Sequence, residues 1–175
     1  MRRFLSVILL LLSTGGLLSG QTGQPTAGEL YHHHLNALNK GNFDSAKVHL
    51  IEILSRFKDL PVYNRALVHN GLGWVYYETS RFNAALRHYL LADSLINATG
   101  TETIPLKISI HNNLGLLYNW LGEYTLTRDH FEKAYHLLDL LNEHDSVYFE
   151  KLSMLQFNRG VLMYLLEEHA EAISL

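Results

Sequence analysis

Residues 69–78 read HNGLGWVYYE and residues 111–120 read HNNLGLLYNW. The two stretches coincide when the chain is shifted by 42 residues, and so do the stretches that follow them, 82–96 and 124–138. The residues that are identical at this offset include His69 and His111, Leu72 and Leu114, Gly73 and Gly115, Tyr76 and Tyr118, and His88 and His130. Self-similarity at a fixed offset is typical of repeat architectures, in which neighbouring units stack to bury their apolar faces.

Helical periodicity continues over the chain after residue 28, with almost no strand-like alternation, so we predict an all-α fold. Breaks rich in Gly, Pro, Asn, Asp and Ser separate pairs of helices, at residues 58–61, 97–105 and 142–146. A shorter turn divides each pair, at residues 40–42, 79–81 and 121–123. The expected unit is a helical hairpin of about 40 residues.

The repeated residues resemble the tetratricopeptide repeat, whose pattern is Trp-x2-Leu-Gly-x2-Tyr followed by Ala-x3-Phe. Here the two copies read His69-x2-Leu72-Gly73-x2-Tyr76 with Ala85-x3-Tyr89, and His111-x2-Leu114-Gly115-x2-Tyr118 with Thr127-x3-Phe131. His replaces Trp in both copies, Thr127 replaces the small Ala, and the offset exceeds the usual ~34 residues. Asn112-Asn113-Leu114-Gly115 is similar to the motif of the longer-helix branch seen in kinesin light chains and in bacterial sensors and peptide receptors.

The resemblance implies an α-solenoid of antiparallel helix pairs in a right-handed superhelix, with about three complete repeats and a truncated fourth. We expect a signal peptide at residues 1–20, a linker at 21–28, a degenerate first repeat at 29–60, and further repeats at 61–104, 105–144 and 145–175. In the first repeat, His34 stands where the close-packing Gly is expected. The last repeat, which supplies Asn158 and Gly160 at the matching positions, ends with an apolar stripe uncovered, so we expect a longer protein with a further domain.

The first twenty residues have the order of a bacterial-type signal peptide. Arg2 and Arg3 give a basic start, residues 4–12 are almost wholly apolar, and small residues lead up to Gly20. The apolar stretch is about half of the ~20 residues that span a bilayer, which favours cleavage after Gly20 over a permanent anchor. We therefore expect export to the periplasm or the cell surface.

Composition excludes several functions. With 47% hydrophobic and 18% charged residues, the chain is expected to fold. A formal charge of −3, with no basic run beyond Arg2-Arg3, argues against nucleic acid and against an anionic membrane surface as partners. The absence of Cys removes disulfides, thiolate metal sites and cysteine nucleophiles. No phosphate-binding, dinucleotide-binding or hydrolase motif occurs in the sequence, so we expect neither an enzyme nor a cofactor.

The eleven histidines raise the question of a metal site. His32, His33 and His34 are consecutive, and neighbouring helical residues point about 100° apart, so the three side chains are not expected to converge on one ion. Glu29-x-x-His32 matches half of a di-iron motif, but the chain holds no second copy. His69 and His111 occupy the Trp position of the repeat, where packing between helices is expected, with a pH-dependent groove as the alternative. We predict no metal site.

The resemblance places a concave groove along the first helix of each hairpin. The residues that it assigns to this groove are Asn70, Trp74 and Tyr77, then Asn112, Leu116 and Asn119, then Phe157, Val161 and Tyr164. Asn113 and Asn158 flank the Asn position, with packing between repeats as the alternative reading. Asn can donate to and accept from an extended peptide backbone, and Tyr and Trp add apolar contact with a polar tip.

The sequence therefore predicts an exported scaffold that binds a peptide or protein segment in this groove. Two alternatives remain open. One is the N-terminal periplasmic sensory segment of a membrane-bound regulator, either a histidine kinase or a helix-turn-helix transcription factor. The other is the recruitment arm of an enzyme whose catalytic domain lies beyond residue 175. Sequence beyond Leu175 distinguishes the three.

Overall fold

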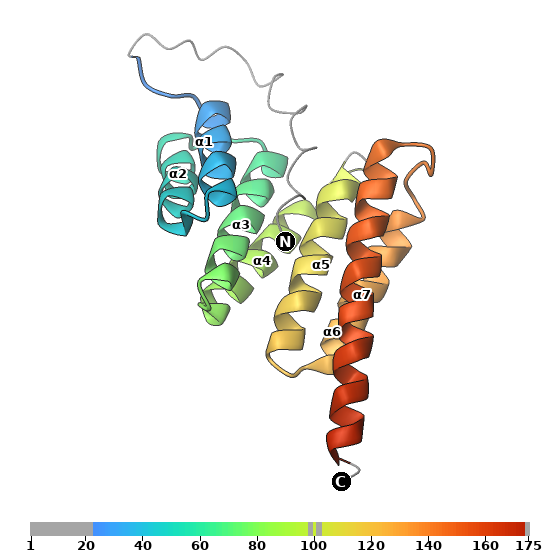
Figure 1. The fold of residues 1–175 in the computed structure, drawn as a ribbon. Coiled ribbons are helices and arrows are strands. Elements are labelled where there is room, and N and C mark those ends of the chain that lie inside the picture. The colour runs from blue at the N-terminus through green and yellow to red at the C-terminus, as the bar shows by residue number, and fades with distance from the viewer. Residues whose placement is uncertain (1–22, 98–99, 101–102, 174–175) are drawn as a thin grey trace. The chain divides into compact units, whose positions relative to one another are not determined.

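The computed structural model describes residues 23–97, 100 and 103–173, with side chains up to residue 160. The predicted signal peptide at 1–20 lies outside the described residues. Within them the regular structure is helical and contains no strand, which confirms the all-α prediction (Figure 1). The helices are α1 (Ala27–Asn39), α2 (Phe43–Arg56), α3 (Val62–Glu78), α4 (Phe82–Ile96), α5 (Ile104–Trp120), α6 (Tyr124–Leu138) and α7 (Ser146–Ile173).

Most helix ends follow the predicted breaks, but α6 ends at Leu138, before the break predicted at 142–146, and the first helix begins early. The linker was expected to reach residue 28, but α1 begins at Ala27. Thr26 is the reason, because its side chain accepts a hydrogen bond from the Glu29 backbone N–H while the Glu29 carboxylate accepts one from the Thr26 N–H. This reciprocal capping satisfies donors that a helix start leaves open, and it fixes where the helix begins.

The three short turns share one backbone feature. Gly41, Ser80 and Gly122 have φ values of 70°, 57° and 76°, which lie in the left-handed region. Glycine adopts this region without steric cost, whereas Ser80 carries a Cβ that disfavours it. The second hairpin therefore makes the same turn as the other two with a less suitable residue.

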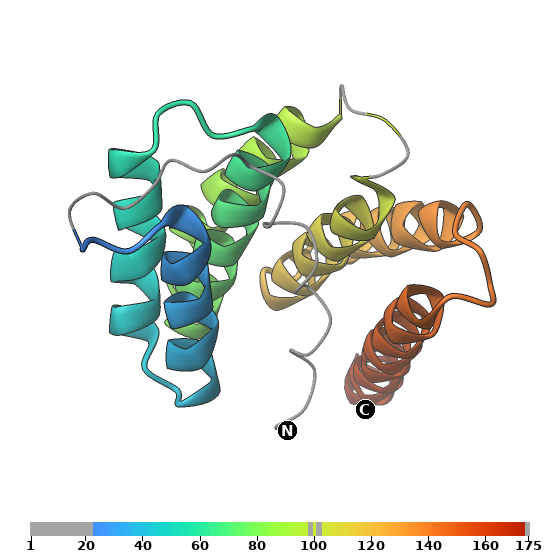
Figure 2. The ribbon, with the colours of Figure 1, turned by 90° about the horizontal axis from the view of Figure 1, so that it is seen from above.

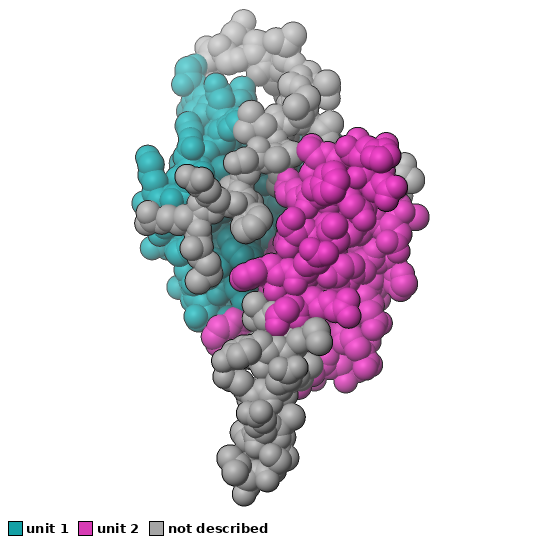
Figure 3. Space-filling model, turned by 45° about the vertical axis from the view of Figure 1, so that its right-hand side comes forward, with its two compact units in different colours: residues 1–88 teal, residues 89–175 magenta. Residues whose placement is uncertain are grey.

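The chain divides into two compact units, residues 1–88 and 89–175, with the boundary inside α4 (Figure 3). In the first unit, α1 and α2 lie side by side and α2 packs on α3 (Figure 2). Ala37, Ala46 and Val75 form a small buried cluster that joins these three helices, with Leu38 and Phe43 packed against it. The small alanines allow the helix backbones to approach closely.

In the second unit, α5 and α6 form the most extensively packed pair, and α7 packs on both of them. Ile104, Ile108, Ala134, Leu138 and Leu155 make up its core cluster, so every helix from α5 to α7 contributes. A Cβ on Gly115 would lie 2.6 Å from Cε1 of the Phe131 ring, which confirms the close approach predicted at this glycine. Gly160, the matching residue of α7, has open space where its Cβ would be.

Consecutive helices thus pair into hairpins, as in an α-solenoid built of repeated helical hairpins. No helix in the described ranges combines the length and the apolar character needed to cross a bilayer.

Candidate functional site

The predicted groove residues of α3 form an aromatic surface in the first unit. Trp74 and Tyr77 are both half-buried, and their rings stack with centroids 5.6 Å apart and planes at 24°. Phe82, at the start of α4, continues the row at 6.0 Å from the Tyr77 ring. Asn70, one turn before Trp74, is also half-buried. The stacked Trp74 and Tyr77 rings, called the aromatic pair below, are rigid, partly exposed and amphipathic, as ligand-contacting aromatics commonly are.

The predicted groove residues of α5 differ from one another in environment. Leu116 and Asn119 are half-buried, and Asn119 Oδ1 is buried without a hydrogen-bond partner among the described residues. A buried carbonyl oxygen with no partner is costly, so it is a natural acceptor for an N–H group supplied by a ligand.

Asn112 lies inside the second unit rather than on its surface. Its exposure is 2%, and its Oδ1 accepts a hydrogen bond of 2.6 Å from Asn158 Nδ2 on α7. Asn113 is half-buried and lies 3.5 Å from the Asn112 amide nitrogen. Asn112 and Asn158 therefore join α5 to α7. For Asn158 this is the packing role that was the alternative prediction. For Asn112 it differs from the predicted position in an open groove. Contact between any of these residues and a peptide stays a prediction.

The fourth set of predicted residues is only partly described. Phe157 is 62% exposed on α7, whereas the side chains of Val161 and Tyr164 lie outside the described residues. An exposed phenylalanine at this position is compatible with ligand contact but does not define a site.

The second and third hairpins, which match at an offset of 42 residues, each contain a pair of contacting histidines at the same positions. His69 on α3 and His88 on α4 are joined by a hydrogen bond of 3.1 Å between their Nδ1 atoms. His111 on α5 and His130 on α6 are joined in the same way at 3.2 Å. In each hairpin a tyrosine of the first helix stacks on the second histidine, Tyr76 on His88 and Tyr118 on His130. His69 and His111 thus pack between the two helices of their own hairpin.

These histidines are neutral at pH 7. Burial lowers the pKa of His69 and that of His130 to about 4, and each is lowered further by its partner ring. Burial also lowers the pKa of His88 and of His111, although the Asp93 carboxylate opposes the shift at His111. Asp93 Oδ1 lies 3.9 Å from His111 Nε2 and has no hydrogen-bond partner among the described residues.

The three consecutive histidines of α1 do not form one group. His32 and His33 are exposed, and the His33 ring lies 5.4 Å from that of His49 on α2. His34 is 1% exposed, and its Nδ1 donates to the Ala46 carbonyl at 3.1 Å. Burial lowers the pKa of His34 to about 4, so its ring serves as a neutral packing group.

Lys151 is a buried charge that the sequence pattern did not indicate. Its Nζ donates to Ser109 Oγ on α5 at 3.0 Å and to Glu150 Oε1 at 3.1 Å. Lysine is rarely buried without partners, and here both partners are provided. No repeat signal indicates this pairing, because the matching positions of α5 and α7 are 45 residues apart, as are Gly115 and Gly160.

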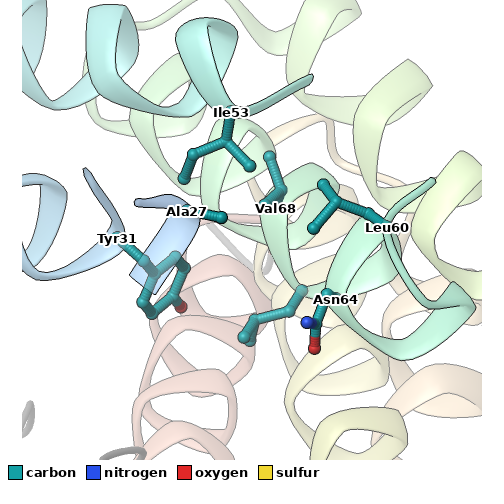
Figure 4. Close-up of a pocket in the computed structure, with 7 residues that line it drawn as sticks. Ala27, Tyr31, Ile53, Leu60, Asn64 and Val68 are labelled. Atoms are coloured by element: carbon teal, nitrogen blue, oxygen red, sulfur yellow. The ribbon is translucent and has the colours of Figure 1, made fainter. Parts of the chain in front are cut away.

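The first unit also holds an apolar crevice between α1, α2 and α3, with about 10 Å³ of free space (Figure 4). It is lined by Ala27, Tyr31, Ile53, Leu60, Asn64, Leu67 and Val68. This space holds one water molecule at most. Burial raises the pKa of the Tyr31 phenol well above its usual value. None of the predicted groove residues lines the crevice, which is a packing defect of the core and not a ligand site.

No protein-family model matches this chain, and a comparison with curated proteins gave no significant match.

Proposed function

We propose that this chain is an exported scaffold of tetratricopeptide type that binds an extended peptide or protein segment on the first helices of its hairpins. The observation that carries the proposal is the aromatic pair of α3. The rings of Trp74 and Tyr77 stack on each other at positions to which the repeat pattern assigns ligand contacts. Both side chains are half-buried and neither is part of the buried core. Their rings offer apolar contact to a proline or aromatic side chain of a bound segment.

Asn119 supports the same proposal in the second unit. Its buried Oδ1 lacks a partner within the described structure and can accept a hydrogen bond from a peptide N–H once the side chains that cover it move aside. Backbone recognition of this kind tolerates many sequences, and the aromatic pair supplies selectivity. Binding to the first unit would therefore depend on Tyr77, and binding to the second unit on Asn119 and much less on Asn112, which is engaged with Asn158.

The two tryptophans of the chain allow a direct test. Trp120 is 66% exposed and lies outside the proposed surface, so the variant Trp120→Phe keeps Trp74 as the single tryptophan. Peptides are first selected from a random display library on the immobilised full chain and then titrated into this variant while Trp74 fluorescence is followed. Selected peptides are expected to be rich in proline or aromatic residues and to change the Trp74 signal.

Adding Tyr77→Ala to the same variant is expected to weaken binding about fivefold, since a stacked aromatic contact contributes on the order of 1 kcal/mol. Phe149→Ala is the matched control, because Phe149 is an exposed aromatic on α7 outside the proposed surface. Peptides that bind with equal affinity to all of these variants, or that leave Trp74 fluorescence unchanged, would exclude the aromatic pair as the site.

Export is tested separately. The full coding sequence is expressed in a bacterium, and the periplasmic fraction is analysed by mass spectrometry of the intact N-terminus. A mature chain that begins at Gln21 supports the proposal. Retention of Met1 in the cytoplasmic fraction contradicts it.

A further inference from the structure

The two histidine pairs have matching separations, although their ring planes meet at 27° in the first pair and at 44° in the second. In both, the Nδ1 atoms are 3.1–3.2 Å apart and the ring centroids 5.3 Å apart. The distance between the ring centroids is close to the Nδ1–Nδ1 distance plus the radii of the two rings. The two Nδ1 atoms therefore lie close to the line that joins the ring centroids and point toward each other. This is the geometry of a nearly linear N–H···N hydrogen bond, in which one Nδ1 carries the proton and the other accepts it.

The two pairs differ in the charges around them. His111 faces the carboxylate of Asp93 on α4, while the position that matches Asp93 in the first unit is Leu54 on α2. The charges acting on the first pair are instead those of Arg65 on His69 and Arg87 on His88, both of which disfavour protonation. Only the second pair has a carboxylate in position to compensate an added proton.

The carboxylate also determines the tautomers of the second pair. A carboxylate oxygen only accepts, so Asp93, 3.9 Å away, favours the His111 tautomer that carries its proton on Nε2. His111 Nδ1 is then the acceptor of the bond between the rings, and His130 Nδ1–H is the donor. The remaining unprotonated nitrogen of the pair is His130 Nε2.

We propose that Asp93, His111 and His130 form a binding site for one proton that the otherwise matching His69–His88 pair lacks. The proton binds at His130 Nε2. The proton on His130 Nδ1 then moves across the hydrogen bond to His111 Nδ1. His130 is left neutral with its proton on Nε2, and the charge rests on His111 against the Asp93 carboxylate. One proton enters, one is transferred, and the hydrogen bond between the rings is kept with its direction reversed.

A second proton is disfavoured because both Nδ1 atoms would then be donors facing each other. The other charges acting on the pair are Lys107 on α5, and Lys133 and Asp129 on α6. Glu150 and Lys151 of α7 pair with each other and Ser109, so they do not supply a competing carboxylate. On mild acidification the site therefore draws Asp93 of α4 toward His111 of α5, which turns a contact of 3.9 Å into an ion pair.

The test is an NMR titration of the uniformly 15N-labelled full chain from pH 8 to pH 3, observing the imidazole nitrogens. At pH 8, His111 is expected to carry its proton on Nε2 and His130 on Nδ1. The second pair is expected to take up a proton about one pH unit above the first pair, because a carboxylate within 4–6 Å favours the charged form by about that much or more.

Two substitutions decide the role of Asp93. Asp93→Asn, which preserves shape, is expected to remove the difference between the pairs. Leu54→Asp is the converse variant at the matching half-buried position of α2, and it is expected to raise the midpoint of the His69–His88 pair by about one pH unit. Equal midpoints in the unmodified chain, the opposite tautomers at pH 8, or a second-pair midpoint that Asp93→Asn leaves unchanged would each overturn the proposal.

Discussion

The imidazole ring of His34 occupies the space that a side chain on Gly71 would need. A Cβ on Gly71 would lie 3.3 Å from His34 Nε2 and 3.0 Å from Leu50 Cδ1. The His34 ring is itself held by the hydrogen bond from its Nδ1 to the Ala46 carbonyl. The His34 ring on α1 stands at the position expected for the close-packing glycine, and the glycine that leaves room for it is on α3, in the next hairpin.

Gly71→Ala and Gly115→Ala are both expected to destabilise the protein. Alanine favours a helix by about 1 kcal/mol over glycine, but the added methyl meets the fixed His34 ring in one case and the buried Phe131 ring in the other. We expect a net loss of about 1 kcal/mol for Gly71→Ala and about 2 kcal/mol for Gly115→Ala, measured by urea unfolding. Gly160→Ala, with open space at its Cβ, is the control and should stabilise slightly. Stabilisation of similar size in all three variants would contradict the close approaches.

Ser80→Gly is expected to raise the free energy of unfolding. Ser80 has a φ of 57° in the turn between α3 and α4, and the two equivalent turns have glycine at this position. Removal of the Cβ strain is partly offset by the greater freedom of glycine in the unfolded chain, so a gain of about 0.5–1 kcal/mol is expected. Thermal unfolding followed by circular dichroism measures it, and Ser80→Ala, which keeps the Cβ, should show no gain.

His34 makes stability depend on pH. Its pKa is lowered to about 4 in the folded protein from an ordinary value near 6.5. The unfolded chain therefore binds a proton that the folded chain does not. The contribution of this difference in proton binding to the free energy of unfolding is fully present above pH 6.5. It is lost progressively as the pH falls toward 4, up to about 3 kcal/mol. Urea unfolding of the unmodified chain and of His34→Gln should show a shallower pH dependence in the variant over this range. Parallel curves would show that His34 is not buried in its neutral form.

The amide pair between α5 and α7 is expected to be cooperative. Asn158→Ala leaves the Asn112 amide buried without its 2.6 Å partner, which costs about 1–3 kcal/mol. The double variant Asn112→Ala/Asn158→Ala removes both groups and should lose at least about 1 kcal/mol less than the sum of the single losses. Strictly additive losses in a urea double-mutant cycle would show that the two side chains do not pair, and would return Asn112 to the proposed peptide surface.

The helical hairpins could be predicted because their signals are local. Gly41 and Gly122 mark turns, Pro105 lies in the first turn of α5, and Gly115 predicts the close approach that the Phe131 ring makes. Each follows from the sterics of a single residue, so one sequence suffices to find it.

The side-chain pairings could not be predicted with the same success, because they depend on which helix faces which. Asn112 was assigned to a groove from its place in the repeat, but Asn158 on α7 pairs with it. From the sequence alone Lys151 would be taken for a surface lysine, and only the structure shows its hydrogen bond to Ser109. His88 and His130 were recognised as repeated residues, yet only the three-dimensional structure shows that they are the partners of His69 and His111.

The contact of Phe131 with Gly115 also limits the ways in which α5 and α6 can mispair when the second unit folds. The residues one turn from Gly115 on the same face of α5 are His111 and Asn119, so larger side chains lie on both sides of the recess that receives the Phe131 ring. If α6 slipped along α5 by one turn, the ring would meet one of these side chains instead of the glycine. A mispaired hairpin is thus penalised at one contact during folding, and the same contact that brings the helices together selects a single alignment between them.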